Sequence, residues 1–247
     1  YAATVNQPIE GMRIGVVKEF ATMPGMDPQV TAAFNAAIEQ YKKLGATIVD
    51  VSLPNSAYGI AAYYVIAPCE ASSNLARYDG VHFGHRTAEQ CHDIIELFSK
   101  SRAEGFGDEV KRRIMIGTYA LSSGYYDAYY VRAQKVRALI KRDYDEAFKK
   151  CDVILTPTSP VPAFKVGEKS SDPLSMYLCD VFTVTCNIAA IPGISLPCGF
   201  TAGEKPLPIG MQLLAPAFAE ERLFQAARVY EKATDWHKAR PMIGDIS

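Results

Sequence analysis

The chain has 247 residues, of which 49% are hydrophobic and 21% are charged, which is an ordinary composition for a globular protein. Its 26 Lys and Arg residues against 27 Asp and Glu residues leave a net charge of −1, so the charge balance indicates neither a nucleic-acid surface nor a membrane surface. No apolar run approaches the length of a membrane-spanning helix, and the N-terminus lacks the layout of a signal peptide. The first residue is Tyr1 rather than Met, which is typical of a piece of a longer protein.

Residues 12–53 predict a strand–helix–strand unit. Met12–Val17 is a short run of branched apolar residues, typical of a buried strand. Asp27 and Pro28 have the pattern of a helix cap followed by a first-turn proline, and Gly45 ends the helix. Ala46–Leu53 predicts the second strand. This order favours parallel pairing of the two strands within an α/β sheet.

Residues 57–150 predict helix almost throughout, with breaks near Arg77–Arg86 and Ser122–Gly124. Strands and helices then alternate over residues 152–234. The predicted elements are a strand at Asp152–Thr156, a helix from Pro173 to about Ala190, strands at Gly193–Pro197 and Ile209–Leu214, and a helix at Phe218–Thr234. Strands at both ends and helices between them predict one α/β domain with a helical insertion.

Arg113 lies on the predicted buried face of a helix. If residues 106–121 are helical, one face carries Phe106, Val110, Arg113, Gly117 and Ala120. An arginine on such a face must pair with an anion, because guanidinium keeps its proton and an unpaired buried charge is costly. That anion is either a structural carboxylate or the carboxylate of a ligand.

Asp180 is the second buried charge that the sequence predicts. Met176, Val184 and Ile188 repeat around it at near-helical spacing, so its carboxylate is expected within a mainly apolar helix. Two facing helices could place Arg113 and Asp180 on opposite walls of one cavity. A zwitterionic α-amino acid needs that arrangement. The alternative is a structural bridge between packed helices, and the residues alone favour the bridge.

Tyrosines gather at two further places. Positions 125, 126, 129 and 130 are all Tyr on adjacent faces of one predicted helix, where they line a polar pocket or serve as core aromatics. Tyr63 and Tyr64 precede Pro68, which interrupts the hydrogen bonding of its helix. A helix with such an interruption can form the edge of a pocket.

The sequence has none of the motifs of a complete catalytic or cofactor site. It lacks a GxSxG elbow, a GxGxxG or GxxxxGK[ST] phosphate loop, and a metal-binding spacing of Cys, His and Asp. The six cysteines are scattered without CxxC or CxxH spacing. They indicate free thiols in a reducing, cytoplasmic compartment rather than a disulfide scaffold.

Several motifs resemble those of the amidase signature enzymes. These are DVILTPTSP, CNIAAIPGISLPCG and PIGMQLL. Two longer segments, EASSNLARYDGVHFGHR and KRRIMIGTYALSSGYYDAYYVRAQKVR, resemble the glutaminase subunits of tRNA-dependent amidotransferases within that family. The resemblance covers essentially the whole chain but only the C-terminal half of the family's sequence. It implies a mixed-sheet α/β/α sandwich of the amidase signature type, represented by its C-terminal half.

The resemblance also implies which residues each half of the complete protein supplies. The family's catalytic lysine, cis-serine and serine nucleophile belong to the N-terminal half, so no catalytic residue is expected in this chain, and it should be inactive alone. By motif match, Arg113 holds the substrate carboxylate, Asp180 lies near the α-ammonium, and Tyr64 lines the pocket. The resemblance therefore favours a ligand site over a structural bridge. One departure is Ala190, where the family usually has glycine.

The resemblance implies an enzyme that converts Glu-tRNA(Gln) to Gln-tRNA(Gln) with glutamine-derived ammonia. The complete complex uses ATP and Mg, and none of these is expected on this chain. The implied partners are glutamine, the missing N-terminal half, the B and C subunits and, through the complex, Glu-tRNA(Gln). Two alternatives stay open: another amidase-signature hydrolase acting on small amides, and a non-catalytic α/β interaction domain.

Overall fold

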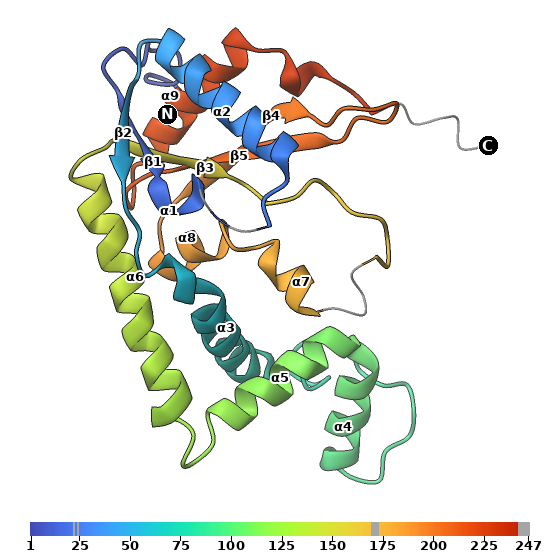
Figure 1. Ribbon diagram of the computed structural model, residues 1–247. Coiled ribbons are helices and arrows are strands. Elements are labelled where there is room, and N and C mark those ends of the chain that lie inside the picture. Colours follow the sequence, from blue (N-terminus) through green and yellow to red (C-terminus); the bar gives the residue numbers. More distant parts are fainter. Residues whose placement is uncertain (22, 24, 169–172, 242–247) are drawn as a thin grey trace. The chain divides into compact units, whose positions relative to one another are not determined.

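The structure is a computed structural model that describes residues 1–241 except 22, 24 and 169–172 (Figure 1). The chain divides into two compact units. We call Tyr1–Ile60 with Ala138–Ser247 the sheet unit, and Ala61–Arg137 the helical unit. Each unit is described by itself.

The sheet unit is built on a five-stranded mixed sheet in the order β2-β1-β3-β5-β4. β1 is parallel to both β2 and β3, whereas β5 is antiparallel to both β3 and β4. This confirms the predicted α/β class with a mixed sheet. The strands are β1 (Arg13–Val17), β2 (Thr47–Val51), β3 (Val153–Pro157), β4 (Gly193–Phe200) and β5 (Pro208–Leu214).

The predicted strand–helix–strand unit is confirmed. β1 and β2 pair in parallel, with Ile14 opposite Ile48. The helix between them is α2 (Pro28–Lys43), and Asp27 caps it by accepting a hydrogen bond from the Gln29 amide at 2.7 Å. A four-residue helix, α1 (Lys18–Ala21), follows β1 directly and was not predicted.

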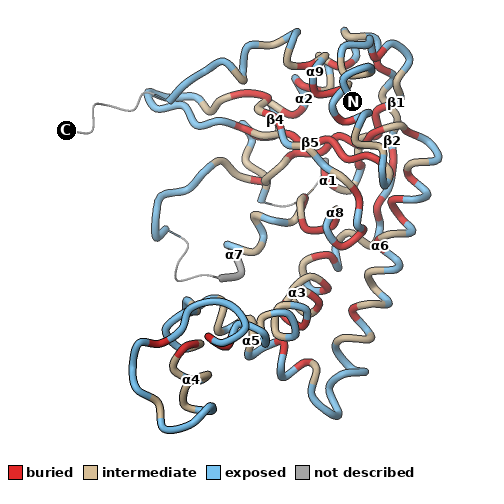
Figure 2. Tube along the Cα trace, turned by 180° about the vertical axis from the view of Figure 1, so that it is seen from behind, coloured by how far each residue is buried: buried red, intermediate tan, exposed pale blue. Residues whose placement is uncertain are grey.

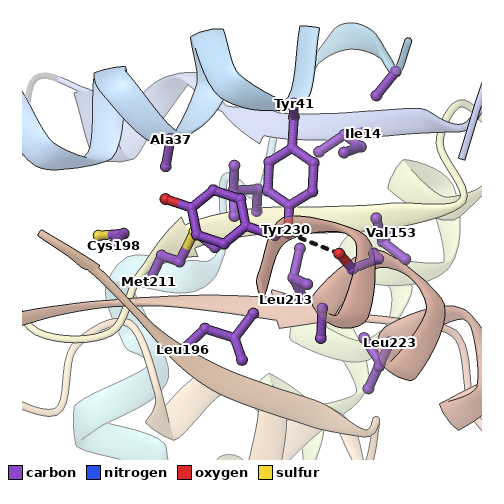
Figure 3. Packing of buried hydrophobic residues seen from close by; sticks show 14 of the residues in the cluster. Ile14, Ala37, Tyr41, Val153, Leu196, Cys198, Met211, Leu213, Leu223 and Tyr230 are labelled. Carbon is purple, nitrogen blue, oxygen red and sulfur yellow. Dashed lines mark hydrogen bonds between the residues drawn. The ribbon is translucent and has the colours of Figure 1, made fainter. Parts of the chain in front are cut away.

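One face of the sheet is covered by α2 and by α9 (Glu220–Ala233) (Figure 1). Tyr41 of α2 and Tyr230 of α9 stack with ring centroids 5.1 Å apart, and the Tyr41 hydroxyl donates to the Ala226 carbonyl at 3.3 Å (Figure 3). Met211 and Leu213 of β5 point into this core. Side chains alternate along a strand, so Gln212 between them points to the opposite face.

That opposite face meets α1, the end of α6 (Arg132–Phe148), and α8 (Val184–Ala189). Phe20 of α1 packs on Phe182 with ring centroids 4.8 Å apart. The Tyr144 hydroxyl of α6 bonds the Thr185 hydroxyl of α8 at 2.7 Å. These buried contacts fix the chain segment that contains Asp180.

The predicted end of the strand that begins at Gly193 is wrong. β4 runs on to Phe200, past Pro197, where the sequence predicted its end. Proline is tolerated in a strand at a sheet edge or at a bulge. β4 is an edge strand, and its register with β5 shifts between Pro197 and Gly199.

The helical unit contains most of α3 (Gly59–Leu75), then α4 (Ile94–Gly105), α5 (Asp108–Ala120) and a π-helical turn at Asp127–Val131. The predicted helical content is thus confirmed, but a further break separates α4 from α5. Phe106 there is extended, and Gly107 begins α5. Much of α4 and α5 is exposed, as Figure 2 shows. The remaining short elements are 3-10 turns at Ser56–Tyr58 and Trp236–Lys238, and α7 (Pro173–Leu178).

Candidate functional site

Arg113 lies on α5 in the helical unit, and its guanidinium is held by three neighbours. Its Nε donates to Glu109 Oε1 at 3.0 Å, and its Nη1 donates to the Tyr63 hydroxyl at 3.4 Å. Its Cζ lies over the ring of Tyr64, 5.7 Å from the centroid. The Arg113 side chain is 31% exposed, so it is partly rather than fully buried. The Nη2 amino group takes part in none of these contacts and is chemically suited to a carboxylate.

Glu109 supplies the carboxylate that pairs with Arg113, and it was not predicted from the sequence. It accepts from Arg112 as well as from Arg113, so the three charged groups together keep one net positive charge. The hydrogen bond from Arg113 to Glu109 is the main reason why the pKa of Arg113 is raised above its ordinary value. The sequence could have indicated the pairing of Glu109 with Arg113, because a glutamate four residues before an arginine is a favourable helix pair.

A close helix crossing brings Tyr63 and Tyr64 to Arg113. A Cβ placed on Gly117 of α5 would lie 2.0 Å from the carbonyl oxygen of Pro68 in α3, so only glycine fits there. Arg113 is one helical turn before Gly117, and Tyr64 is one turn before Pro68. The crossing therefore places the guanidinium against the two tyrosines.

Asp180 lies in the sheet unit, in the turn that separates α7 from α8. The prediction of one continuous helix from Pro173 to about Ala190 is wrong, and so is the prediction that Asp180 is buried, since the residue is exposed. The helix breaks because Phe182 turns inward and is fully buried against Phe20. The Asp180 backbone carbonyl accepts from the amides of Thr183 at 3.0 Å and Val184 at 2.9 Å, which closes the turn.

The three predicted binding residues therefore fall into two groups. Arg113 and Tyr64 are brought together in the helical unit, and Asp180 belongs to the sheet unit. That the two groups face one bound amino acid stays a prediction. The first group already has the character of an anion site, with a cation, an aromatic face and a phenol side by side.

The tyrosines predicted to cluster around positions 125–130 lie near the surface rather than in the core. Tyr125, Tyr126 and Tyr129 are between 40% and 46% exposed. The rings of Tyr119 and Tyr125 lie 4.4 Å apart, and a hydrogen bond with Tyr125 is the main cause that raises the pKa of Tyr119 to about 12. At this pKa, Tyr119 is a neutral phenol at physiological pH.

Over residues 1–241 apart from 22, 24 and 169–172, no group of three or more His, Cys, Asp or Glu side chains is arranged to hold a metal ion. Within the same ranges no helix is both long and apolar enough to cross a membrane. All six cysteines are free thiols.

The mixed sheet, with helices on both faces and a helical segment inserted between its strands, defines a protein of the α/β class. The family model described as Amidase matches residues 1–224, and the chain belongs to this family. This agrees with the family motifs on β3, β4 and β5.

Two curated relatives are named as the A subunit of glutamyl-tRNA(Gln) amidotransferase. The protein from Dechloromonas aromatica (strain RCB) is 56% identical over 98% of this chain and 49% of its own length. That from Anaeromyxobacter sp. (strain K) is 58% identical over 94% of this chain and 46% of its own length. The chain thus spans about half the length of the curated relatives it matches.

Two solved structures are similar to this chain. The crystal structure of the glutamyl-tRNA(Gln) amidotransferase A subunit from Thermotoga maritima has a TM-score of 0.70 and 40% sequence identity, covering 93% of this chain and 44% of that chain. A 6-aminohexanoate cyclic dimer hydrolase has a TM-score of 0.73 over 98% of this chain and 49% of that chain, at 20% identity. The second likeness is one of fold alone.

Proposed function

We propose that this chain supplies the glutamine-binding side of a glutaminase, as part of the A subunit of a glutamyl-tRNA(Gln) amidotransferase. Relatives more than 50% identical to the chain carry that name. In the complete enzyme, ammonia released from glutamine amidates Glu-tRNA(Gln). We assign the ATP and Mg²⁺ that this amidation uses to the complete complex rather than to this chain.

The observation that carries the proposal is the environment of Arg113. Glu109, Tyr63 and Tyr64 hold the guanidinium, and the charged cluster keeps one positive charge for a ligand. A guanidinium binds a carboxylate by two parallel hydrogen bonds. We assign it the α-carboxylate of glutamine, with Tyr64 lining the pocket.

Asp180 holds the α-ammonium, which is bonded to the same Cα as the α-carboxylate. With both charged groups fixed, the side-chain amide is oriented toward a nucleophile supplied by the remaining half of the enzyme. An analogue without the α-ammonium loses that charge pair, so the site discriminates in favour of α-amino acids.

The remaining half of the glutaminase is the first partner that the proposal requires. The helical unit exposes several large apolar side chains, and we assign them to this interface. They include Ile95 and Met115, each 72% exposed, and Tyr119, 53% exposed. The complete enzyme has further partners, which are the B and C subunits and the tRNA. We place this enzyme in a reducing, cytoplasmic compartment.

The test compares Arg113→Ala and Asp180→Ala with wild type, in the full-length protein assembled with its partners. We expect each variant to lower kcat/KM for glutamine by about a hundredfold or more, which is the loss of one strong charged interaction. Lys111→Ala is the matched control for the first variant, because Lys111 is a cation on the same helix that lies near Asp108 and outside the cluster of Arg112, Arg113 and Glu109. Asp108→Ala, with a side chain that is 98% exposed, is the control for the second.

Both controls should retain glutamine hydrolysis, and all four variants should keep the unfolding midpoint of wild type within a few degrees. Wild-type glutamine turnover in Arg113→Ala or Asp180→Ala would contradict the assignment of that residue. If the wild-type complex prefers small aliphatic amides to glutamine, the protein is another hydrolase of the amidase family instead.

A further inference from the structure

Gln212 is a buried polar residue in the middle of β5, 4% exposed. Its neighbours Met211 and Leu213 point into the main core, and its own side chain points to the other face of the sheet. A buried amide is costly unless it is hydrogen-bonded, and an apolar residue would fill this position without that cost. The side chain therefore needs a specific explanation.

The hydrogen bonds of Gln212 fix which way its amide points. Nε2 donates to the Phe182 carbonyl at 2.6 Å and to the Thr156 hydroxyl at 2.8 Å. The Thr156 hydroxyl donates its one proton to the Pro157 carbonyl at 3.0 Å, so toward Gln212 it accepts. A carbonyl also only accepts. Both partners therefore require the NH₂ end of the amide, which uses its two protons on them.

The Phe182 carbonyl belongs to the turn that contains Asp180. The Phe182 ring is fully buried against Phe20, so its peptide is held by the ring on one side and by Gln212 on the other. Two residues earlier, the Asp180 carbonyl accepts from the amides of Thr183 and Val184. The turn is short and internally bonded, so fixing the Phe182 peptide also fixes the backbone of Asp180.

We propose that Gln212 is a positioning residue for substrate binding: its amide locks the turn that presents Asp180 to the α-ammonium of the substrate. This inference rests on the proposed role of Asp180. Gln212 itself touches no substrate. Without its donors, the Phe182 carbonyl is buried and unpaired, and the turn rearranges to reach another donor.

The experiment separates positioning from general stability by using two substrates. Glutamine and 4-carbamoylbutanoate share the amide and the distal carboxylate, but the second lacks the α-ammonium and makes no use of Asp180. We measure kcat and KM for both in the assembled complete enzyme and compare the ratio of the two kcat/KM values. Gln212→Met has nearly the volume of glutamine and removes both donors.

We expect Gln212→Met to lower kcat/KM for glutamine about tenfold, mainly through KM, while 4-carbamoylbutanoate changes less than about twofold. Tyr41→Phe is the matched control, because it removes another buried hydrogen bond to a carbonyl, that of Ala226, on the opposite face of the same sheet. Its ratio should equal that of wild type.

A second, milder variant keeps the test valid if Gln212→Met does not fold. Thr156→Val leaves Gln212 its bond to Phe182 but removes the acceptor that orients the amide. We expect a smaller fall of the ratio in the same direction. An unchanged ratio in folded Gln212→Met and Thr156→Val, or an equal loss on both substrates, overturns the inference and leaves Gln212 a structural residue. A wild-type enzyme that does not distinguish the two substrates overturns the role of Asp180 itself, and the positioning role with it.

Discussion

Ala190 ends α8 with φ of 55° and ψ of 49°, in the left-handed region. An L-residue with a Cβ pays roughly 1–2 kcal/mol there, whereas glycine adopts it freely. Ala190 is exposed, so its methyl group contributes little packing in return. The resemblance to the amidase family led us to expect glycine at this position, and the backbone now gives the physical reason.

We predict that Ala190→Gly stabilises the protein by about 0.5–1 kcal/mol, because it removes this strain at a helix C-terminus. Denaturant unfolding of the full-length protein, followed by circular dichroism, measures the change. Ala189→Gly is the control one residue earlier. Ala189 is buried inside α8, so its replacement should destabilise by about 1 kcal/mol or more. A lower stability of Ala190→Gly would mean that the left-handed conformation carries no strain.

Arg113 and Asp180 show how far residue patterns could predict the candidate site. The sequence correctly indicated that Arg113 needs an anion, and Glu109, four residues earlier, was available as a helix partner. For Asp180, helical spacing was misleading. The apolar residues around it are those of a turn anchored by Phe182, and the anchor depends on Gln212, which is 30 residues away in the chain.

At the scale of elements, the crossing of α3 and α5 controls the Arg113 site. Besides the approach of Gly117 to Pro68, the hydroxyls of Ser72 and Thr118 lie 2.8 Å apart across the same crossing. The close approach excludes any Cβ at position 117, since atoms of a backbone carbonyl cannot move aside as a flexible side chain can. The helix axis itself must shift.

We predict that Gly117→Ala destabilises the protein by about 2–4 kcal/mol and raises KM for glutamine, because α5 moves away from Tyr63 and Tyr64. The intrinsic helix preference works in the opposite direction, since alanine is the better helix former by about 1 kcal/mol. Thermal unfolding and steady-state kinetics of the complete enzyme measure both effects.

Gly107→Ala is the control for this crossing. A Cβ on Gly107 meets no atom within 4 Å, and its φ of −69° is accessible to alanine. The loss should stay below about 1 kcal/mol, the cost of a poorer helix cap. Equal effects of the two substitutions would show that the close approach does not limit this site.

The elements themselves were largely predictable, and the reasons differ. β1, β2 and β3 are short apolar runs between breakers, so their identity follows from composition alone. The extension of β4 past Pro197 depends on its position at the sheet edge, which only the topology reveals. The break at Gly107 was missed because the apolar spacing continues across it.

At the scale of the molecule, Asp152 joins segments that are far apart in the sequence. It precedes β3, and its carboxylate accepts from the backbone amide of Arg13 at the start of β1 at 2.8 Å and from the Arg13 guanidinium at 2.8 Å and 3.2 Å. Arg222 of α9 lies 3.8 Å away. The hydrogen bonds from Arg13 are the main cause that lowers the pKa of Asp152.

The sign of the pH effect follows from this lowered pKa. A carboxyl group whose pKa is lower in the folded state stabilises that state fully above its unfolded pKa of about 3.9, and the contribution is lost as the pH falls through the folded value. Asp152→Asn cannot ionise and lacks the contribution at every pH. We therefore predict that the variant unfolds a few degrees below wild type at pH 7.

We expect this difference to stay constant down to about pH 5 and to shrink below about pH 4, where wild type loses the same charge by protonation. Thermal melting of both proteins across that range measures it. Asp108→Asn is the control, since the Asp108 side chain is 98% exposed and should show no difference at any pH. If the Asp152 difference instead persisted unchanged at low pH, its origin would be the shape of the side chain rather than its charge. The link between β1, β3 and α9 would then be steric.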